Sequence, residues 1–227
     1  MILIDGDILA YRAAYYCEDK DEEEGQHKID DIVDGILYDT SFDPATADYE
    51  MFITGKGNFR FDVQPTYKGN RKDKPRPIHL NAMRQYLIDG YKAKVSSGQE
   101  ADDDIAIRAT ELGPRTIIAS IDKDFLQVPC MHYNFNRKTL VEVNEFGGLK
   151  FIYAQILQGD TADNVFGLKG IGAVKSVRML ESATTERELY DLCVEAYDGD
   201  VSKVKENAQL LWLLRKEGEL WQEPLAA

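Results

Sequence analysis

Four carboxylates occur within five residues in the stretch Glu100-Ala101-Asp102-Asp103-Asp104, which the apolar Ile105 follows at once. In a helix of about 3.6 residues per turn, Glu100, Asp103 and Asp104 share one face, where their like charges repel one another. At the first turn of a solvated helix, the same acids would be favoured by the positive end of the helix dipole. Taken alone, the stretch favours a solvated helix start.

Three more pairs of carboxylates weaken that interpretation, because their spacings also align side chains. The pairs are Asp5 and Asp7, Asp122 and Asp124, and Asp160 and Asp163. The first two pairs follow apolar runs at a spacing that places both side chains on the same side of a strand. The third pair is separated by one helical turn. Clustered carboxylates need a cation, and their hard oxygen ligands suit Mg²⁺ or Mn²⁺, so we expect the fold to gather these acids around divalent metal ions.

Positive charge is concentrated from Lys68 to Arg76, a stretch with five cations and one anion. Prolines exclude a long helix through it, and most basic runs of this kind are solvated loops. Tyr67, directly before Lys68, favours nucleic acid, because an aromatic ring can stack on a base while neighbouring cations hold phosphates. A local basic patch can bind phosphate even in a chain with a net charge of −13, and metal ions can bridge acids to phosphate.

A second candidate for phosphate binding is the turn Gly167-Leu168-Lys169-Gly170-Ile171-Gly172-Ala173 between two predicted short helices. Its glycine spacing predicts a tight hairpin whose backbone amides point outward and could seat a DNA phosphate. We expect a side chain at Gly170 or Gly172 to crowd this turn. The alternative is a turn that only packs two helices together, and the neighbouring Asp163-Asn164 favours the phosphate-binding interpretation.

Composition is that of a soluble globular protein and argues against several other classes. The 227 residues suffice for one sizeable domain or a domain with a small appendage, and the 44% apolar and 30% charged residues are ordinary. No apolar run reaches the roughly 18 residues of a membrane span, and the first residues are too acidic for a signal peptide. Three scattered cysteines and three histidines lack the spacing of a zinc site. We expect reduced thiols and a cytoplasmic protein.

Strands and helices alternate along residues 1–150, which predicts an α/β fold with a mainly parallel sheet and right-handed crossovers. Predicted strands cover residues 1–5, 49–54, 91–95 and 116–120, and a hairpin or edge strands cover 131–135 and 139–143. After the first strand, Asp7 is better placed to cap the next helix than to bind metal. Residues 18–28 are predicted as a loop, and helices follow over 29–38 and 78–89.

Residues 151–227 are predicted as a helical region. Thr185 and Glu188 have the spacing of a capping box at the start of a helix. The last helix is predicted over 202–216. Both helices are expected to contribute core packing and no chemistry.

The order of these motifs resembles the 5′-nuclease family, which comprises the phage 5′→3′ exonucleases, the flap endonucleases and the 5′-nuclease domain of bacterial DNA polymerase I. Each motif alone is weak, but five in the family's order, spanning nearly the whole chain, are a strong signal. The motifs are Asp5-Gly6, Tyr67-Lys68-Gly69-Asn70-Arg71, Glu100-Ala101-Asp102-Asp103, Asp122-Lys123-Asp124-Phe125, and Gly159-Asp160 through Asp163-Asn164 to Gly170-Ile171-Gly172.

The resemblance implies a PIN-like α/β nuclease core over residues 1–150 and a helix–three-turn–helix DNA-binding element within residues 151–227. It implies two Mg²⁺ or Mn²⁺ ions, held directly or through water by Asp5, Glu100, Asp102, Asp103, Asp122, Asp124, Asp160 and Asp163. The residue matching Lys68 would position or activate the scissile phosphate. DNA contacts are expected from Arg12, Tyr67, Lys68, Arg71, Lys72, Gly170, Gly172 and Lys175. A potassium ion would bind the carbonyls of the glycine turn.

The chain also departs from the family pattern. Thr54-Gly55 stand where the family carries an Asp before Lys-Gly, so one metal ligand is missing or another residue supplies it. Asp104 replaces an apolar residue, either as a substitute ligand or as an exposed acid. Phe166 replaces a proline after Asp163-Asn164. The stretch from Arg71 to His79 is too short and proline-rich for an ordered threading arch over single-stranded DNA.

Together the motifs predict a metal-dependent 5′→3′ exonuclease acting on DNA, with flap endonuclease activity as a close variant. Two metal ions about 3.5–4 Å apart would activate water and stabilise the leaving oxygen, so no side-chain nucleophile is needed. The expected catalytic residues are Asp5, Asp103, Asp122 and Lys68, of which Lys68 would stabilise charge on the phosphate. We expect a monomer that acts in DNA replication on 5′ ends of duplex, nicked or flapped DNA, away from membranes.

Two alternatives stay open. A PIN-type ribonuclease would share the acidic core, but it has no reason to carry the glycine turn. A non-catalytic duplex-DNA-binding protein would use the turn and the basic segment, but it has no reason to carry the full set of acids.

Overall fold

The computed structural model describes residues 1–72 and 74–225, which form two compact units. The first unit comprises Met1–Gly57, Pro75–Phe125 and Cys130–Glu142, and the second comprises Asn58–Lys74, Leu126–Pro129 and Val143–Ala227. The domain boundary predicted after residue 150 falls within the second unit, and it stays a prediction. Asp73, the one acid of the basic segment, and residues 226–227 of the predicted helical region lie outside the described residues.

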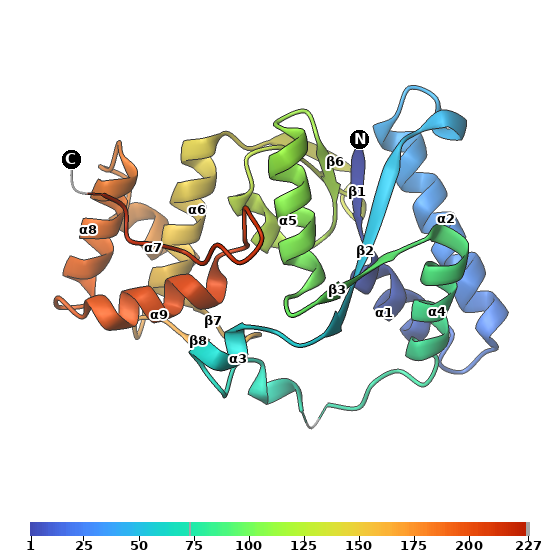
Figure 1. The fold of residues 1–227 in the computed structure, drawn as a ribbon, viewed down its shortest axis with the longest axis horizontal. Helices are drawn as coiled ribbons and strands as arrows, with labels where there is room; N and C mark the ends of the chain where they lie inside the picture. Colours follow the sequence, from blue (N-terminus) through green and yellow to red (C-terminus); the bar gives the residue numbers. More distant parts are fainter. Residues whose placement is uncertain (73, 226–227) are drawn as a thin grey trace. The chain divides into compact units, whose positions relative to one another are not determined.

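A six-stranded sheet in the order β3-β2-β1-β4-β5-β6 forms the centre of the first unit (Figure 1). Its strands are β1 (Ile2–Asp5), β2 (Tyr49–Lys56), β3 (Lys94–Ser97), β4 (Ile117–Ala119), β5 (Met131–Asn134) and β6 (Thr139–Glu142). Neighbouring strands are parallel except for β5 and β6, which form the predicted hairpin. The apolar residues of β1 are buried, as expected of parallel strands that are covered on both faces. The prediction of a mainly parallel sheet is confirmed.

Helices cover both faces of this sheet. On one face, α1 (Gly6–Tyr16), α2 (Glu22–Thr40) and α4 (Leu80–Tyr91) pack together over a core that includes Ile4, Met51 and Ile53. On the other face, α5 (Ala101–Leu112) packs against β1, β2 and β4 (Figure 1). The short 3-10 segments η1 (Pro44–Thr46) and η3 (Lys123–Gln127) follow α2 and β4. The packing on both faces holds the sheet in place, and the sheet determines where the residue after each strand lies.

Two predicted boundaries in the first unit are wrong. α2 begins at Glu22, inside the predicted loop over 18–28, because the Asp21 side chain caps it by accepting from the amide of Glu24. Glu22, Glu23 and Glu24 lie in the first turn of α2, where acids are stabilised by the helix dipole. The strand predicted over 91–95 begins only at Lys94, because α4 continues to Tyr91.

The second unit is mainly helical. Its elements are α3 (Arg60–Val63), η2 (Gly69–Arg71), α6 (Glu145–Gln158), the strand pair β7 (Gly159–Asp160) and β8 (Val165–Phe166), α7 (Ala173–Met179), α8 (Glu186–Ala196) and α9 (Val201–Leu211). α6 contacts α7, α8 and α9 over a core that includes Ile156, Leu189 and Cys193. The predicted capping box of Thr185 and Glu188 starts α8, whereas α9 ends earlier than the predicted residue 216. The helix–three-turn–helix assignment stays a prediction.

Arg60, at the start of α3, joins this short helix to the end of α9. Its side chain is 1% exposed and donates to the carbonyls of Leu210 and Trp212 at 2.8 and 2.7 Å. These carbonyls lie at the end of α9, where helical partners are missing, so the guanidinium satisfies them. The basic segment therefore follows a firmly anchored turn.

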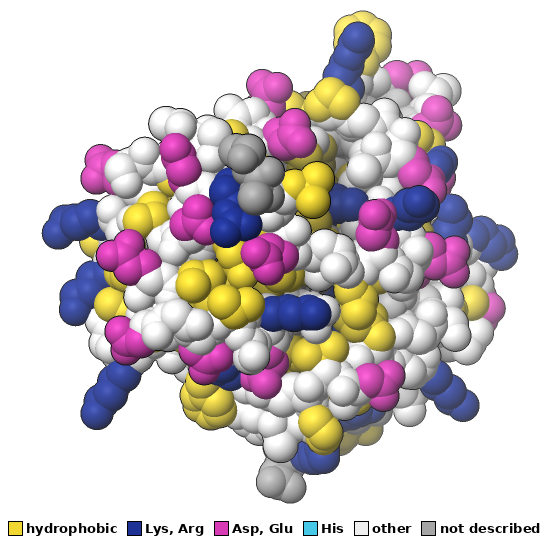
Figure 2. All heavy atoms as spheres, turned by 60° about the vertical axis from the view of Figure 1, so that its left-hand side comes forward, with side chains coloured by type: hydrophobic (Ala, Val, Ile, Leu, Met, Phe, Trp, Pro, Cys, Tyr) yellow, Lys and Arg dark blue, Asp and Glu magenta, His cyan; other side chains and the backbone are white. Residues whose placement is uncertain are grey.

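Among residues 1–72 and 74–225, no helix is long and apolar enough to cross a membrane. Across the face drawn in Figure 2, Lys and Arg side chains are interspersed with Asp and Glu. The net charge of −13 therefore does not make this face uniformly negative.

Candidate active site

The acids of the first unit lie where its parallel strands end. Asp5 ends β1, Asp122 and Asp124 follow β4, and Glu100 and Asp103 stand at the start of α5 after β3. Since β1 and β4 are neighbours and parallel, the residues after them lie at the same edge of the sheet. Binding sites of parallel α/β proteins collect at this edge.

Asp5 is 2% exposed, and its two carboxylate oxygens have different donors. Oδ1 accepts from the amide of Ile8 at 3.2 Å, so Asp5 caps α1, and the prediction that Asp7 would do so is wrong. Oδ2 accepts from the hydroxyl of Ser120 at 2.7 Å. The Ser120 oxygen in turn accepts from the amide of Asp122 at 3.0 Å. Ser120 therefore links two of the predicted metal ligands.

Burial raises the pKa of Asp5 to about 7; the Ser120 hydrogen bond opposes this rise, and repulsion from Asp7 and Asp122 adds to it. Neither Ser120 nor the Ile8 amide carries a charge, so ionising this buried carboxyl is costly without a cation beside it. Sequence reasoning missed Ser120. Its position at the end of an apolar run, just before Asp122, is the signal that could have found it.

Glu100 and Asp103 hold each other at the start of α5. The Glu100 amide donates to Asp103 Oδ2 at 3.1 Å, and the Glu100 side chain accepts from the Asp103 amide. They are 9% and 0% exposed, whereas Asp102 and Asp104 are half-buried. Asp104 accepts from the side chain of Gln99. That Asp104 replaces the missing metal ligand stays a prediction.

No three Asp, Glu, His or Cys side chains within the described ranges converge closely enough to hold a metal ion. Several of the acids have partners within the chain instead: Asp122 Oδ1 accepts from the Asp124 amide at 2.9 Å, and Asp124 Oδ1 lies 3.9 Å from Lys123 Nζ. Metal binding would require these side chains to exchange such bonds for the ion. The donor set itself fits, because buried carboxylate oxygens at one sheet edge are the ligands that Mg²⁺ and Mn²⁺ prefer.

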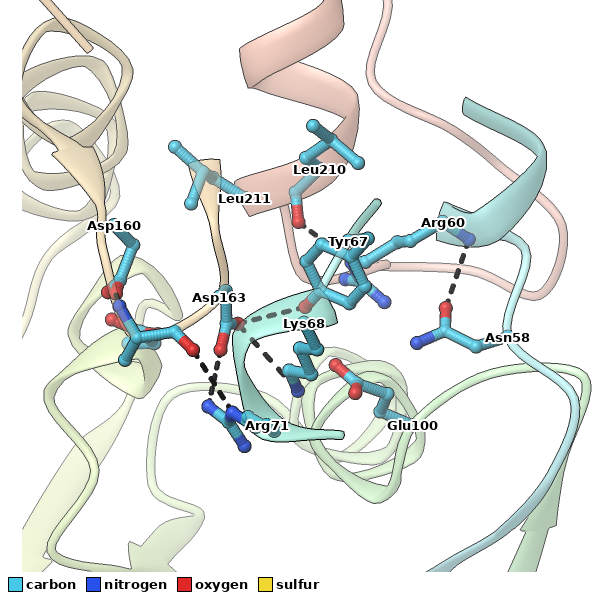
Figure 3. A network of polar contacts seen from close by, with 12 residues as sticks. Asn58, Arg60, Tyr67, Lys68, Arg71, Glu100, Asp160, Asp163, Leu210 and Leu211 are labelled. Carbon is cyan, nitrogen blue, oxygen red and sulfur yellow. Dashed lines mark hydrogen bonds and ion pairs between the residues drawn. The ribbon is translucent and has the colours of Figure 1, made fainter. Parts of the chain in front are cut away.

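Asp160 and Asp163, the other two predicted ligands, lie on the β7–β8 hairpin of the second unit. Asp160 is 8% exposed. Asp163 Oδ2 accepts from the Tyr67 hydroxyl at 2.9 Å and lies 3.7 Å from Lys68 Nζ, and Oδ1 accepts from the Arg71 guanidinium (Figure 3). Asp163 is thus already surrounded by a hydroxyl and two cations.

Backbone groups also dock the basic segment onto this hairpin. The Lys68 amide donates to the Asp163 carbonyl at 2.8 Å. The side chains of Asn70 and Arg71 donate to the carbonyls of Thr161 and Ala162 at 2.6 and 3.1 Å. Asn70 and Thr161 are 91 residues apart in the chain. Two of the sequence motifs therefore form one connected structure in the second unit.

The first two residues of the motif Tyr67-Lys68-Gly69-Asn70-Arg71 are placed very differently. Tyr67 is 2% exposed and belongs to the core of the second unit, so a base has no ring face on which to stack. The pattern of an aromatic beside cations does not show burial; here Tyr67 supports Asp163 through its hydroxyl. Lys68 has a φ of 52°, uncommon for a residue with a side chain, and the docking contacts hold it there. Its contact with substrate, like those of Arg71 and the exposed Lys72, stays a prediction.

The glycine turn is open to solvent. Gly170 has a φ of 78°, which favours glycine, whereas the φ of −112° at Gly172 suits any residue. A Cβ at either position would meet no described atom within 4 Å, so the expected crowding within the chain is wrong. Lys175 Nζ donates to the Gly170 carbonyl at 3.0 Å. A potassium ion at these carbonyls stays a prediction.

A hollow of about 490 Å³, here called the α1 hollow, includes Ile121, the residue directly before Asp122. It is lined by Ile8, Tyr11, Arg12, Tyr15, Tyr16, Lys28 and Ile121. The three tyrosines are 38, 57 and 43% exposed. Arg12, the predicted DNA contact, donates to the Asn136 side chain at 2.6 Å. Sequence reasoning did not single out the tyrosines as a surface, although their spacing along α1 is visible.

Buried acids at the carboxyl edge of a flanked parallel sheet are typical of metal-dependent nuclease folds. Residues 1–147 match the family described as 5′-3′ exonuclease, N-terminal resolvase-like domain. The chain belongs to this family, which confirms the resemblance to the 5′-nucleases.

Two curated relatives are consistent with this membership. DNA polymerase I of Chloroflexus aurantiacus is 28% identical over 206 residues, which cover 80% of this chain and 22% of the polymerase. Flap endonuclease Xni of Shewanella sediminis is 31% identical over 138 residues, which cover 55% of this chain and 54% of the relative. The chain therefore spans less than two thirds of either relative.

Solved structures share the fold. The bacteriophage T5 flap endonuclease, in a pseudo-enzyme-product complex with DNA and metal ions, has a TM-score of 0.69 at 18% identity, covering 94% of this chain and 88% of that chain. T5 5′-exonuclease with bound zinc has a TM-score of 0.65 at 19% identity, covering 93% and 88%. At such identities the likeness concerns the fold alone, and it confirms the predicted PIN-like α/β type.

We predict that Asp163→Asn speeds tryptic cleavage within residues 68–76 by about fivefold, because losing the ion pairs with Lys68 and Arg71 makes local opening easier by about 1 kcal/mol. Cleavage sites and rates are read by mass spectrometry. Asp191→Asn is the matched control, since it removes a comparable pair with Arg187 at 2.8 Å on α8. Equal cleavage rates in this segment for both variants would show that Asp163 does not hold it.

Proposed function

We propose that this chain is a divalent-metal-dependent 5′→3′ exonuclease that hydrolyses DNA, with flap endonuclease activity as a close variant. One observation carries the proposal: Asp5 is buried at the carboxyl edge of the sheet, linked through Ser120 to Asp122, with uncharged donors. A carboxylate in that position favours a cation beside it. Membership in the 5′-3′ exonuclease family supports nuclease chemistry at this edge.

The proposed ions are two Mg²⁺ or Mn²⁺. Ligands from the first unit are Asp5, Glu100, Asp102, Asp103, Asp122 and Asp124. When bound, such ions lower the pKa of a water nucleophile and stabilise the leaving oxygen. Asp160 and Asp163 are added as ligands by the family resemblance alone. Divalent ions are supported by the T5 relatives, which were solved with metal ions.

Several residues of this chain would prepare the ligands. The Ser120 hydroxyl orients Asp5 by occupying one of its oxygens. The reciprocal hydrogen bonds between Glu100 and Asp103 set both at the start of α5. Partners of this kind matter because they fix ligand orientation before the ion arrives.

Lys68 and Arg71 would hold the phosphate of the substrate. Lysine offers a compact point charge, and arginine offers a planar fork that matches two phosphate oxygens. Both now pair with Asp163, so a phosphate would exchange with that carboxylate. The contacts with the β7–β8 hairpin would hold the side chains of both residues in place for the phosphate.

DNA is the proposed substrate. The glycine turn with Lys175 would seat backbone phosphates through amides and charge. In the α1 hollow, exposed tyrosines beside Arg12 and Lys28 offer stacking faces with cations for unpaired nucleotides. The T5 flap endonuclease was solved with DNA, which supports this class of ligand.

We predict that the chain shortens 5′-labelled duplex, nicked and flap DNA only with Mg²⁺ or Mn²⁺, and that Asp122→Asn lowers the single-turnover rate at least about a hundredfold. Binding of the same DNA in Ca²⁺ should survive, because the acids hold ions and other residues hold DNA. Product lengths on a sequencing gel measure the first effect, and fluorescence anisotropy measures the second.

Asp89→Asn on the exposed surface of α4 controls for the chemical change itself and should cleave like wild type. Near-wild-type cleavage by Asp122→Asn would contradict the metal assignment. Preferential cleavage of RNA strands would favour the ribonuclease alternative, and binding without any metal-dependent cleavage would favour the non-catalytic one.

The glycine turn gives a further prediction. Gly172→Val should fold and melt like wild type, since its Cβ meets open space in the chain, yet its side chain should obstruct an approaching phosphate. Affinity for unrelated duplex sequences should fall equally, and the slope of log K against log salt should shrink by about 1. Gly35→Val on α2, where a Cβ also meets no described atom within 4 Å, is the control. A wild-type affinity and salt slope for Gly172→Val would show that the turn does not contact DNA.

A further inference from the structure

Arg84 of α4 binds both an acid and a strand end in the first unit. One guanidinium nitrogen donates to Asp7 Oδ1, and the other donates to the carbonyl of Thr54 at the end of β2. Asp7 Oδ2 accepts from the amide of Thr54 at 2.8 Å. Asp7 and Arg84 together therefore satisfy both backbone groups of one residue. These three residues are called the Arg84 clamp.

The clamp reaches the acidic helix through the side chain of Thr54. Its hydroxyl oxygen accepts from the amide of Ala101 at 2.9 Å. Ala101 is the first residue of α5, directly after Glu100 and in the same turn as Asp103. A hydroxyl on β2 thus holds the first turn of the helix that carries these acids.

β2 and β3 approach very closely beside Thr54. A Cβ on the next residue, Gly55, would lie 2.1 Å from the carbonyl oxygen of Ser96 on β3. The register of the two strands shifts between Ile53 and Lys56, so regular strand pairing does not by itself place Thr54. The hydrogen bonds from Arg84 and to Asp7 therefore contribute to its position.

The opposite charges of Asp7 and Arg84 also favour the contacts of the Arg84 clamp. Asp7 and Arg84 have side chains that are 22% and 24% exposed, so the pair is largely withdrawn from water. Asp7 lies two residues from Asp5, and without Arg84 its charge would add to that of the acids at the sheet edge. Removing one partner of a partly buried pair leaves the other uncompensated.

Thr54 also stands where the chain departs from the family pattern. Its side chain is committed to the α5 backbone and offers no carboxylate to an ion. The family pattern has a metal-binding Asp at this position. The contacts point to a different contribution at this position, which is to orient ligands on the neighbouring helix.

We propose that Arg84 is a positioning residue of the candidate metal site. Through Asp7 and Thr54 it fixes the start of α5 and thereby the orientation of Glu100 and Asp103. This inference rests on the proposed function, in which those acids hold divalent metal. It assigns Arg84 no contact with the ion or with DNA.

The test measures Mn²⁺ binding by calorimetry, without DNA and without turnover, together with thermal unfolding in EDTA. Arg84→Met breaks the clamp, and Thr54→Val removes only the hydroxyl acceptor at nearly constant shape. Both should weaken Mn²⁺ binding about tenfold or more, as loss of a group that orients metal ligands does. Thr54→Ser keeps the hydroxyl and should restore wild-type affinity.

Arg108→Met is the matched control, because Arg108 of α5 pairs with Glu50 of β2 at 2.9 Å and joins the same two elements elsewhere. It should lower the unfolding temperature and leave the Mn²⁺ affinity unchanged.

If Thr54→Val and Arg84→Met also melt lower but bind Mn²⁺ like wild type, the clamp is structural only and the proposal is overturned. Should Arg84→Met fail to fold, the Thr54→Val and Thr54→Ser pair decides alone. A wild-type chain that binds no Mn²⁺ would instead overturn the proposed function, and the role of the clamp with it.

Discussion

The first unit must accommodate buried carboxylates at the carboxyl edge of its parallel sheet, and its other polar contacts depend on this. β1 and β4 are parallel neighbours, so Asp5 and Asp122 emerge at the same edge, and burial raises the pKa of Asp5 to about 7. Hydroxyl and amide donors orient these carboxylates but supply no positive charge. The Arg84 clamp pairs the charge of Asp7 with a cation and holds the first turn of α5. Divalent cations are the proposed remaining compensation, and they also supply the chemistry that the family carries out.

In the second unit, by contrast, cations are already paired with an acid. Two cations of the basic segment, Lys68 and Arg71, pair with Asp163, which also accepts from the Tyr67 hydroxyl. Docking onto the β7–β8 hairpin orders the segment before any phosphate binds, so less conformational entropy is lost on binding. An exposed loop with the same composition would bind phosphate without fixing its position. The pairing therefore favours a role in placing a phosphate over one in general attraction.

Many of the strands and the acids at their ends could be predicted from the sequence. The contacts that depend on distant parts of the chain, or on which side of a residue is buried, could not. Apolar runs that end in acids predicted β1, β4 and the acids at their ends, because burial and strand ends leave a local pattern. The contribution of Arg84 left none, since its partner Asp7 is 77 residues away. The burial of Tyr67 was not predictable, because adjacency to lysine does not show which side of the chain is buried. Asp5 caps α1 in place of the predicted Asp7, since both have the chemistry of a cap and only the path of the backbone distinguishes them.

The central claim is that the acids at the carboxyl edge of the first unit bind divalent metal. A crystal structure of the chain grown with Mn²⁺, analysed by anomalous scattering, tests it most directly. The account predicts anomalous peaks about 2.0–2.6 Å from carboxylate oxygens of this set, with Asp5 or Asp122 among the ligands, as for hard cations with oxygen ligands. Mn²⁺ bound only elsewhere, with these carboxylates still held by Ser120 and the backbone, would contradict it.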